Sequence, residues 1–113
     1  MANWSFLNRE DQLAAILRAS HERPQLIFKH STQCGTSAMV FDMLEGAVPE
    51  LVAVADLYYL DLLAYRPVSN QVAQELNIPH QSPQVIMIQG GVPVYHASHM
   101  AIHPRKLIES VRS

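Results

Sequence analysis

The sequence is poor in several features that mark particular classes of protein. It has one cysteine in 113 residues, so the fold cannot depend on an internal disulfide. Charged residues make up only 16% of the chain and the net charge is −2, which gives no electrostatic attraction for nucleic acid. No apolar run approaches the roughly 18 residues that a membrane helix needs. We therefore expect neither nucleic acid nor a membrane among the partners.

The N-terminal stretch "MANWSFLNREDQ" also lacks the pattern of a secretory signal, because acidic residues come before any long apolar run. We therefore expect a cytoplasmic protein. With 49% hydrophobic residues, the composition is that of an ordinary globular protein. The length predicts a single domain over residues 1–113.

Helical and strand patterns alternate along the chain. Apolar spacing predicts helices over 9–20, 36–46, 66–77 and 103–113, and strands over 25–30 and 54–65. Two apolar runs within 82–98 flank Gly90-Gly91 and predict a hairpin, whose second strand lies at a sheet edge because it contains Pro93. This order predicts an α/β fold, with a mixed four-stranded sheet and helices on both faces. We expect Trp4 and Phe6 to hold the first helix against the core.

The single cysteine, Cys34, lies between the predicted strand 25–30 and the predicted helix 36–46. The first N–H groups of a helix have no internal partner, and the helix dipole is positive there. Both effects favour a thiolate, which is the nucleophilic form of cysteine. The alternative is a small buried hydrophobic residue, which is what many free cysteines are.

The residues around Cys34 strengthen the first interpretation. Cys34-Gly35-Thr36-Ser37 is a Cys-x-x-Ser sequence, and a residue three positions on lies one helical turn away. We therefore predict that Ser37 donates a hydrogen bond to the thiolate, and Thr32 or Thr36 could add another. With no second thiol in the chain, Cys34 can form only a mixed disulfide with another molecule.

Three segments resemble the monothiol bacilliredoxin family of bacillithiol-linked redox proteins: "FKHSTQCGTSAMVFD", "RPVSN" and "NIPHQSPQVIMIQGG". The resemblance extends from about Leu26 to the C-terminal helix. Residues that match the family's motifs are Lys29, His30, Ser31, Cys34, Ser37, His80, Ser82, Pro83 and Gln84. The family's usual Thr-Cys-Pro-Ile-Ser is replaced here at Gln33, Gly35 and Thr36.

The resemblance implies a thioredoxin-like fold and a reaction. Cys34 would attack a protein mixed disulfide and take up the small thiol, with bacillithiol as co-substrate and no bound cofactor. The implied partners are this small thiol and thiolated client proteins. The resemblance also implies a cis bond at Ser82-Pro83, facing the cysteine, which X-Pro sequences permit. The residues expected to bind substrate are Thr32, Gly35, Thr36, Ser82 and Pro83.

The sequence contains six histidines, and two of them are placed to tune the cysteine. His30 precedes Cys34 by four residues, and His80 precedes the expected cis-proline by three. One alternative role is a metal site that combines Cys34 with histidines, of which His96, His99 and His103 are close together in the sequence. The other is that the histidines are ordinary polar residues at the surface or at strand ends. No Cys-x-x-Cys or His-Glu-x-x-His spacing is present, so we predict no metal.

The methionines Met39, Met43, Met87 and Met100 are expected to fill the core. Two further functions stay open at this stage. One is a non-catalytic thioredoxin-fold module that binds proteins, because a second cysteine is missing. The other is a redox sensor whose Cys34 forms a disulfide between two copies of the chain.

Overall fold

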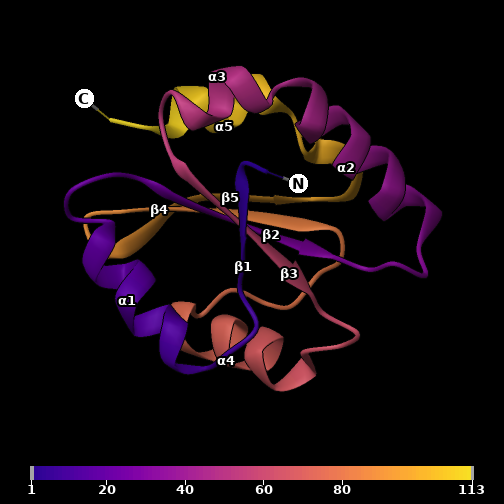
Figure 1. The fold of residues 1–113 in the computed structure, drawn as a ribbon, viewed down its shortest axis with the longest axis horizontal. Helices are drawn as coiled ribbons and strands as arrows, with labels where there is room; N and C mark the ends of the chain where they lie inside the picture. The colour runs from indigo at the N-terminus through magenta and orange to yellow at the C-terminus, as the bar shows by residue number, and fades with distance from the viewer. Residues whose placement is uncertain (1, 113) are drawn as a thin grey trace.

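A five-stranded mixed sheet lies at the centre of the molecule (Figure 1), in a computed structural model that describes residues 2–112. Its strand order is β1 (Trp4–Phe6), β3 (Asp56–Asp61), β2 (Gln25–His30), β4 (Gln84–Gln89) and β5 (Val92–Ser98). The first three are parallel, while β4 is antiparallel to β2, and β5 to β4. The carboxyl ends of β1, β3 and β2 therefore share one edge of the sheet.

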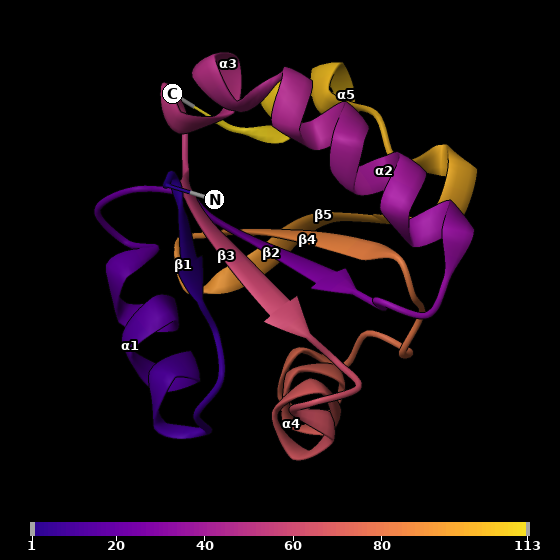
Figure 2. The ribbon, with the colours of Figure 1, turned by 45° about the vertical axis from the view of Figure 1, so that its right-hand side comes forward.

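Helices cover both faces of this sheet (Figures 1 and 2). One face carries α2 (Gly35–Gly46), α3 (Val48–Val52) and α5 (Pro104–Ser110), and the other carries α1 (Asp11–Ala19) and α4 (Arg66–Leu76). A 3-10 turn, η1 (His99–Ala101), joins β5 to α5. The predicted α/β architecture is confirmed, with five strands in place of four.

The additional strand is β1, and it changes the role expected for Trp4. Trp4 is buried in the core beneath α2, where its ring centroid lies 6.0 Å from those of both Phe28 and Phe41. Its indole Nε1 donates to a Glu45 carboxylate oxygen at 2.7 Å. Phe6 is 54% exposed. The expectation that these two residues hold α1 against the core is therefore wrong, because β1 pairs with β3 and directs Trp4 to the opposite face.

Strand β2 separates two hydrophobic cores. Leu26 and Phe28 belong to the core under α2, and Ile27 belongs to the core under α1 and α4. Successive side chains of a strand point to opposite faces, and here both faces are covered, so all six β2 residues are buried. This alternation places Lys29 on the α4 face and His30 on the α2 face.

Other expectations meet mixed outcomes. Strand β5, which contains Pro93, lies at the sheet edge as predicted. The last helix ends at Ser110, short of its predicted end at Ser113, which lies outside the described residues. Met87 is buried, but Met39 and Met100 are 61% and 67% exposed, so their assignment to the core is wrong. No helix within residues 2–112 is long and apolar enough to cross a bilayer.

Candidate active site

Cys34 lies at the carboxyl edge of the parallel strands, where the chain leaves β2. It is the N-cap residue of α2, in extended conformation, and it is partly exposed. Its backbone carbonyl accepts the first helical hydrogen bond, from the Ala38 N–H at 3.1 Å. The predicted position at a helix start is therefore confirmed. The cysteine side chain makes no capping hydrogen bond to the helix amides.

The hydroxyl of Ser37 has partners other than the sulfur. Ser37 is fully buried, and its Oγ accepts a hydrogen bond from the Ser31 N–H at 3.0 Å. The same oxygen lies 2.7 Å from Nδ1 of His30. Among the hydrogen bonds of residues 2–112, none joins Ser37 to Cys34. The predicted bond to the sulfur is therefore replaced by two contacts that fasten the end of β2 to the first turn of α2.

The protonation of His30 decides where the Ser37 hydrogen goes. A serine hydroxyl has one hydrogen and two acceptor sites, and the Ser31 N–H occupies one of the latter. If Nδ1 of His30 is unprotonated, it accepts the Ser37 hydrogen. If Nδ1 carries a proton, it donates to Ser37, and the serine hydrogen becomes available to another acceptor.

The surroundings of His30 favour its neutral form. Burial lowers its pKa from 6.5, and the carboxylate of Asp61 opposes this shift. Asp61 is the residue opposite His30 in the β2–β3 pairing. The His30 ring also packs between aromatic rings, with centroids 5.5 Å from Phe41 and 5.4 Å from Tyr59. His30 is thus a buried imidazole beside the cysteine loop, with its pKa lowered by burial.

Pro83 comes to the same edge of the sheet. The Ser82-Pro83 peptide bond is cis. Lys29 pairs with Gln84 across β2 and β4, so Pro83, one residue earlier, lies opposite the His30 end of β2. The Pro83 carbonyl accepts from the His99 N–H at 3.0 Å, and η1 packs against α2. Figure 2 shows η1, in gold, beside the start of α2.

The remaining residues expected to bind substrate lie around this edge. Thr32 and Gly35 are exposed and Thr36 is partly buried, all within the loop and first turn at Cys34. Ser82 is partly buried, and its hydroxyl oxygen has no hydrogen-bond partner in the described part of the chain. The structure thus brings Cys34, its flanking residues and the Ser82-Pro83 segment to one edge.

His80 belongs to a different group of side chains. It is exposed, and its Nδ1 lies 3.3 Å from Nζ of Lys29 and 3.4 Å from Oγ of Ser69. Lys29 is fully buried and donates a second hydrogen bond to the Ser69 carbonyl at 3.0 Å. Because Lys29 points to the α4 face, this cluster lies on the opposite side of the sheet from α2. The expected proximity of His80 to the cysteine loop therefore holds for its chain segment, not for its side chain.

Lys29 and Ser69 lie in the segments that resemble the family, but the sequence alone assigns neither residue to a functional site. A lysine in a strand reads as a surface residue, since lysine is seldom buried. Here burial lowers the Lys29 pKa from 10.5 to about 8. The sequence signal for this burial is that Lys29 directly follows the apolar run 26–28, in a strand expected to have helices on both faces.

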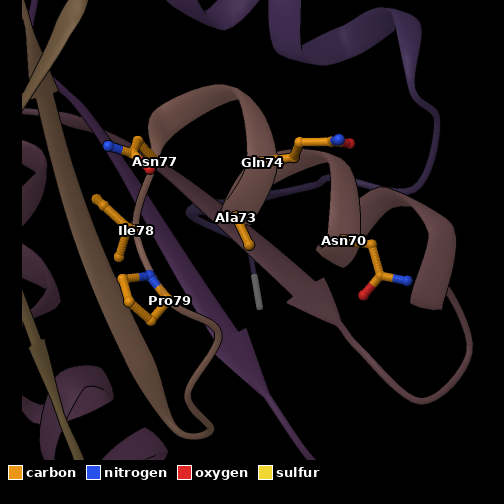
Figure 3. Close-up of a pocket in the computed structure, with 6 residues that line it drawn as sticks. All are labelled: Asn70, Ala73, Gln74, Asn77, Ile78 and Pro79. Atoms are coloured by element: carbon orange, nitrogen blue, oxygen red, sulfur yellow. The ribbon is translucent and has the colours of Figure 1, made fainter.

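A shallow, open surface pocket of about 420 Å³ lies between α4 and residues 77–79, lined by the sequence neighbours of Ser69 and His80 (Figure 3). Its lining is Asn70, Ala73, Gln74, Asn77, Ile78 and Pro79. None of these was expected to bind substrate. As for metal, no three histidine, cysteine or acidic side chains within residues 2–112 are grouped so as to hold an ion, and this includes the segment from His96 to His103.

Comparison with solved structures shows what the fold is similar to. A thioredoxin-fold protein proposed to be an oxidoreductase is 26% identical, with a TM-score of 0.84, and the match covers 96% of this chain and 94% of that one. The thioredoxin Mala s 13 of Malassezia sympodialis is 18% identical, with a TM-score of 0.71 and coverage of 95% and 86%. Thioredoxin from Trypanosoma brucei brucei is 14% identical, with a TM-score of 0.72 and coverage of 95% and 86%. The chain therefore has a thioredoxin fold.

Comparison with models of protein families identifies the family to which the chain belongs. The model described as "Monothiol bacilliredoxin BrxC" matches residues 5–107, which include Cys34, Pro83 and both of the histidine environments described above. The match covers nearly the whole chain and agrees with a single cysteine at the start of α2. The chain belongs to the monothiol bacilliredoxin family.

Proposed function

We propose that the protein removes a low-molecular-weight thiol, bacillithiol, from protein mixed disulfides by thiol–disulfide exchange at Cys34. The observation that carries the proposal is the position of this sulfur. It is the only cysteine, it is partly exposed, and it caps α2 at the edge where cis-Pro83 lies. Membership of the monothiol bacilliredoxin family supports this proposal.

The exchange needs no net oxidation or reduction. The Cys34 thiolate attacks the small-thiol sulfur of the mixed disulfide, and a new S–S bond forms as the old one breaks. The client sulfur leaves as a thiolate and takes a proton from water. Cys34 then carries the small thiol. Because the chain has no second thiol, a free thiol from another molecule must attack this adduct to restore Cys34.

The surrounding groups support each part of this step. The unpaired amides and the positive dipole at the start of α2 favour negative charge on the sulfur. Ser37 and His30 can supply a hydrogen toward it when His30 is protonated at Nδ1. The segment at Ser82 and Pro83 lies where an extended client backbone could pair beside the cysteine.

The test is the intact mass of the protein after mixing with oxidised bacillithiol, and separately with oxidised glutathione. We expect one rapid adduct with bacillithiol at neutral pH in the wild type and none in Cys34→Ala. Circular dichroism should show that the variant is folded, because Cys34 is only partly buried and makes no capping bond.

Other outcomes would point elsewhere. Slow adducts with both thiols would overturn the enzymatic proposal and favour a module that only binds proteins. A dimer on non-reducing electrophoresis after mild oxidation, absent in Cys34→Ala, would favour a redox sensor.

A further inference from the structure

The three sequence segments that match the family meet at a second place, away from Cys34. Lys29 comes from the segment that ends β2, Ser69 from "RPVSN" at the start of α4, and His80 from the segment that precedes cis-Pro83. Lys29 Nζ contacts both of the others, at 3.0 Å from the Ser69 carbonyl and 3.3 Å from Nδ1 of His80. Exchange chemistry at Cys34 leaves this cluster without a role.

Within residues 2–112, the positive charge of Lys29 contacts no carboxylate. Lys29 is fully buried, and a buried ammonium is costly unless it is paired. Both of its partners are neutral acceptors, and one of its three hydrogens has no partner in the described part of the chain. The carboxylate of Asp61 lies opposite His30 in the β2–β3 pairing, and its Oδ1 accepts from the Ala64 N–H. An anion would supply the missing charge.

Two exposed donors make the cluster accessible from solvent. Because Nδ1 of His80 accepts from Lys29, the neutral His80 ring carries its hydrogen on Nε2, and His80 is exposed. Arg66 lies one helical turn before Ser69, is exposed, and makes no ion pair within residues 2–112. Arg66 also begins α4, so the positive end of that helix dipole adds to the field.

We propose that Lys29, Arg66 and His80 form a binding site for a carboxylate of the small thiol that Cys34 takes up. This inference rests on the function proposed above. His80 is three residues before cis-Pro83 and Lys29 is five residues before Cys34, so the cluster and the sulfur lie at the same end of β2, on opposite faces of the sheet. The small thiol would then span the edge of the sheet, with its sulfur at Cys34 and its carboxylate at His80 and Arg66, above the Lys29 charge.

The open pocket in Figure 3 offers a surface on which the rest of such a ligand can lie. Asn70 and Pro79, which line it, are the sequence neighbours of Ser69 and His80. The polar groups around it are the neutral amides of Asn70, Gln74 and Asn77, which can donate to and accept from hydroxyl or peptide groups. The site therefore fits a thiol that has a carboxylate and an uncharged polar body.

The test compares disulfides that differ in charge. The rate of adduct formation at Cys34 is measured with oxidised bacillithiol and oxidised glutathione, which carry carboxylates, and with 2-hydroxyethyl disulfide, which carries none. We expect Arg66→Gln and His80→Gln each to slow the bacillithiol reaction roughly three- to tenfold and to leave the 2-hydroxyethyl reaction unchanged. High salt should reduce the difference between wild type and variants.

Arg18→Gln is the matched control. Arg18 is an exposed arginine in α1, two residues before Ser20, whose carbonyl accepts from Gly90 at the other end of the sheet. It should react like the wild type with all three disulfides. Equal slowing with all disulfides in the Arg66 and His80 variants, or no slowing, would overturn the carboxylate site.

The outcomes keep this inference apart from the proposed function. If the wild type reacts rapidly but the variants show no charge-dependent change, the carboxylate site fails and exchange at Cys34 stands. If the wild type reacts with none of the disulfides, the proposed function fails. The glutathione arm shows whether any carboxylate-bearing thiol is accepted or only bacillithiol.

Discussion

Two successive residues of β2, Lys29 and His30, have opposite surroundings although both are buried basic side chains. His30 lies on the α2 face, among aromatic rings, with Ser37 as its hydrogen-bond partner and Asp61 across the strand pair. Lys29 lies on the α4 face with Ser69 and His80, and in the part of the chain that the structure describes it contacts no carboxylate. The end of one strand therefore supports the reactive sulfur on one face and a cluster of positive charge on the other.

Ser37→Ala should have the largest effect on the α2 face, because it removes the hydrogen-bond partner of His30. The change leaves the Ser31 N–H and Nδ1 of His30 without their partner, which should lower the free energy of unfolding by roughly 2–4 kcal/mol. Urea denaturation measures this loss. We also expect slower alkylation of Cys34 by iodoacetamide, because the first turn of α2 is no longer fastened to β2.

Ser110→Ala is the matched control for that variant. Ser110 Oγ donates only to the Leu107 carbonyl within its own helix, so its loss should cost at most about 1 kcal/mol and leave alkylation unchanged. A Ser37→Ala protein as stable as the Ser110→Ala protein would contradict the role given to the His30–Ser37 pair.

The burial of Lys29 on the α4 face should make the stability of the protein depend on pH. Burial lowers the Lys29 pKa to about 8 in the folded protein, against 10.5 for an ordinary lysine. Between these values the unfolded chain binds more protons, so the free energy of unfolding rises with pH. Relative to Lys29→Met, the wild type should gain roughly 2 kcal/mol between pH 8 and pH 10.

Urea denaturation of both proteins across this pH range measures the gain, and groups common to both cancel in the difference. Lys106→Met, which removes an exposed lysine of α5, is the matched control for the loss of a lysine charge. A difference between wild type and Lys29→Met that stays constant from pH 8 to pH 10 would overturn the lowered pKa of Lys29.

The two histidines should respond to different substitutions. The pKa of His80 is lowered by burial and then by the charges of Lys29 and Arg66, so Lys29→Met and Arg66→Gln should each raise it and leave His30 unchanged. Asp61→Asn should lower the pKa of His30 further and leave His80 unchanged. NMR titration of the imidazole protons measures both. A shift of both histidines in any one variant would mean that the two faces are electrostatically coupled.

These histidines also set the behaviour of the wild type in acid. Folding lowers both pKa values from 6.5, so the unfolded chain binds more protons below that pH. The protein should therefore lose stability as the pH falls below about 6.5.

The smallest expected effect is at Gly35, where the family's usual residue is proline. Gly35 is the first residue of α2, a Cβ there meets nothing within 4 Å, and Cys34 before it has the extended conformation that proline requires. Gly35→Pro should therefore raise the free energy of unfolding by roughly 0.5 kcal/mol.

Gly91→Ala is the contrasting variant, since it should destabilise the turn. Gly91 has a φ of +83°, and its added Cβ would lie 2.7 Å from Nε2 of His21.

The sequence allowed most of the fold to be predicted because the main elements have clear local patterns. These patterns are local: the apolar spacing of a helix, the Gly90-Gly91 turn and the edge strand with Pro93 can each be recognised from a few neighbouring residues. Strand β1 has only three residues, Trp4–Phe6, and it is stabilised by pairing with β3, some fifty residues later. No local pattern shows such a pairing. The exposure of Met39 and Met100 likewise depends on how α2 and η1 pack against their neighbours.

The candidate site was predictable in its position but not in its contacts. One cysteine at a strand-to-helix junction indicated where the sulfur lies. The spacing of Ser37 indicated nearness to Cys34, but it could not show that the Ser31 N–H and His30 occupy the serine oxygen. The Lys29 cluster could not be predicted, because it depends on how three segments come together in the fold. Lys29 and Ser69 are 40 residues apart, and Ser69 and His80 are 11 residues apart.

The position of Trp4 has a practical consequence. It is the only tryptophan, and its ring touches Phe28 and Phe41, which both touch the His30 ring. A row of aromatic rings therefore connects the one strong intrinsic fluorophore to the imidazole beside the cysteine loop. Changes in the charge of that imidazole should alter the emission of Trp4, so the unlabelled protein can report the state of its own reactive edge in a stopped-flow fluorimeter.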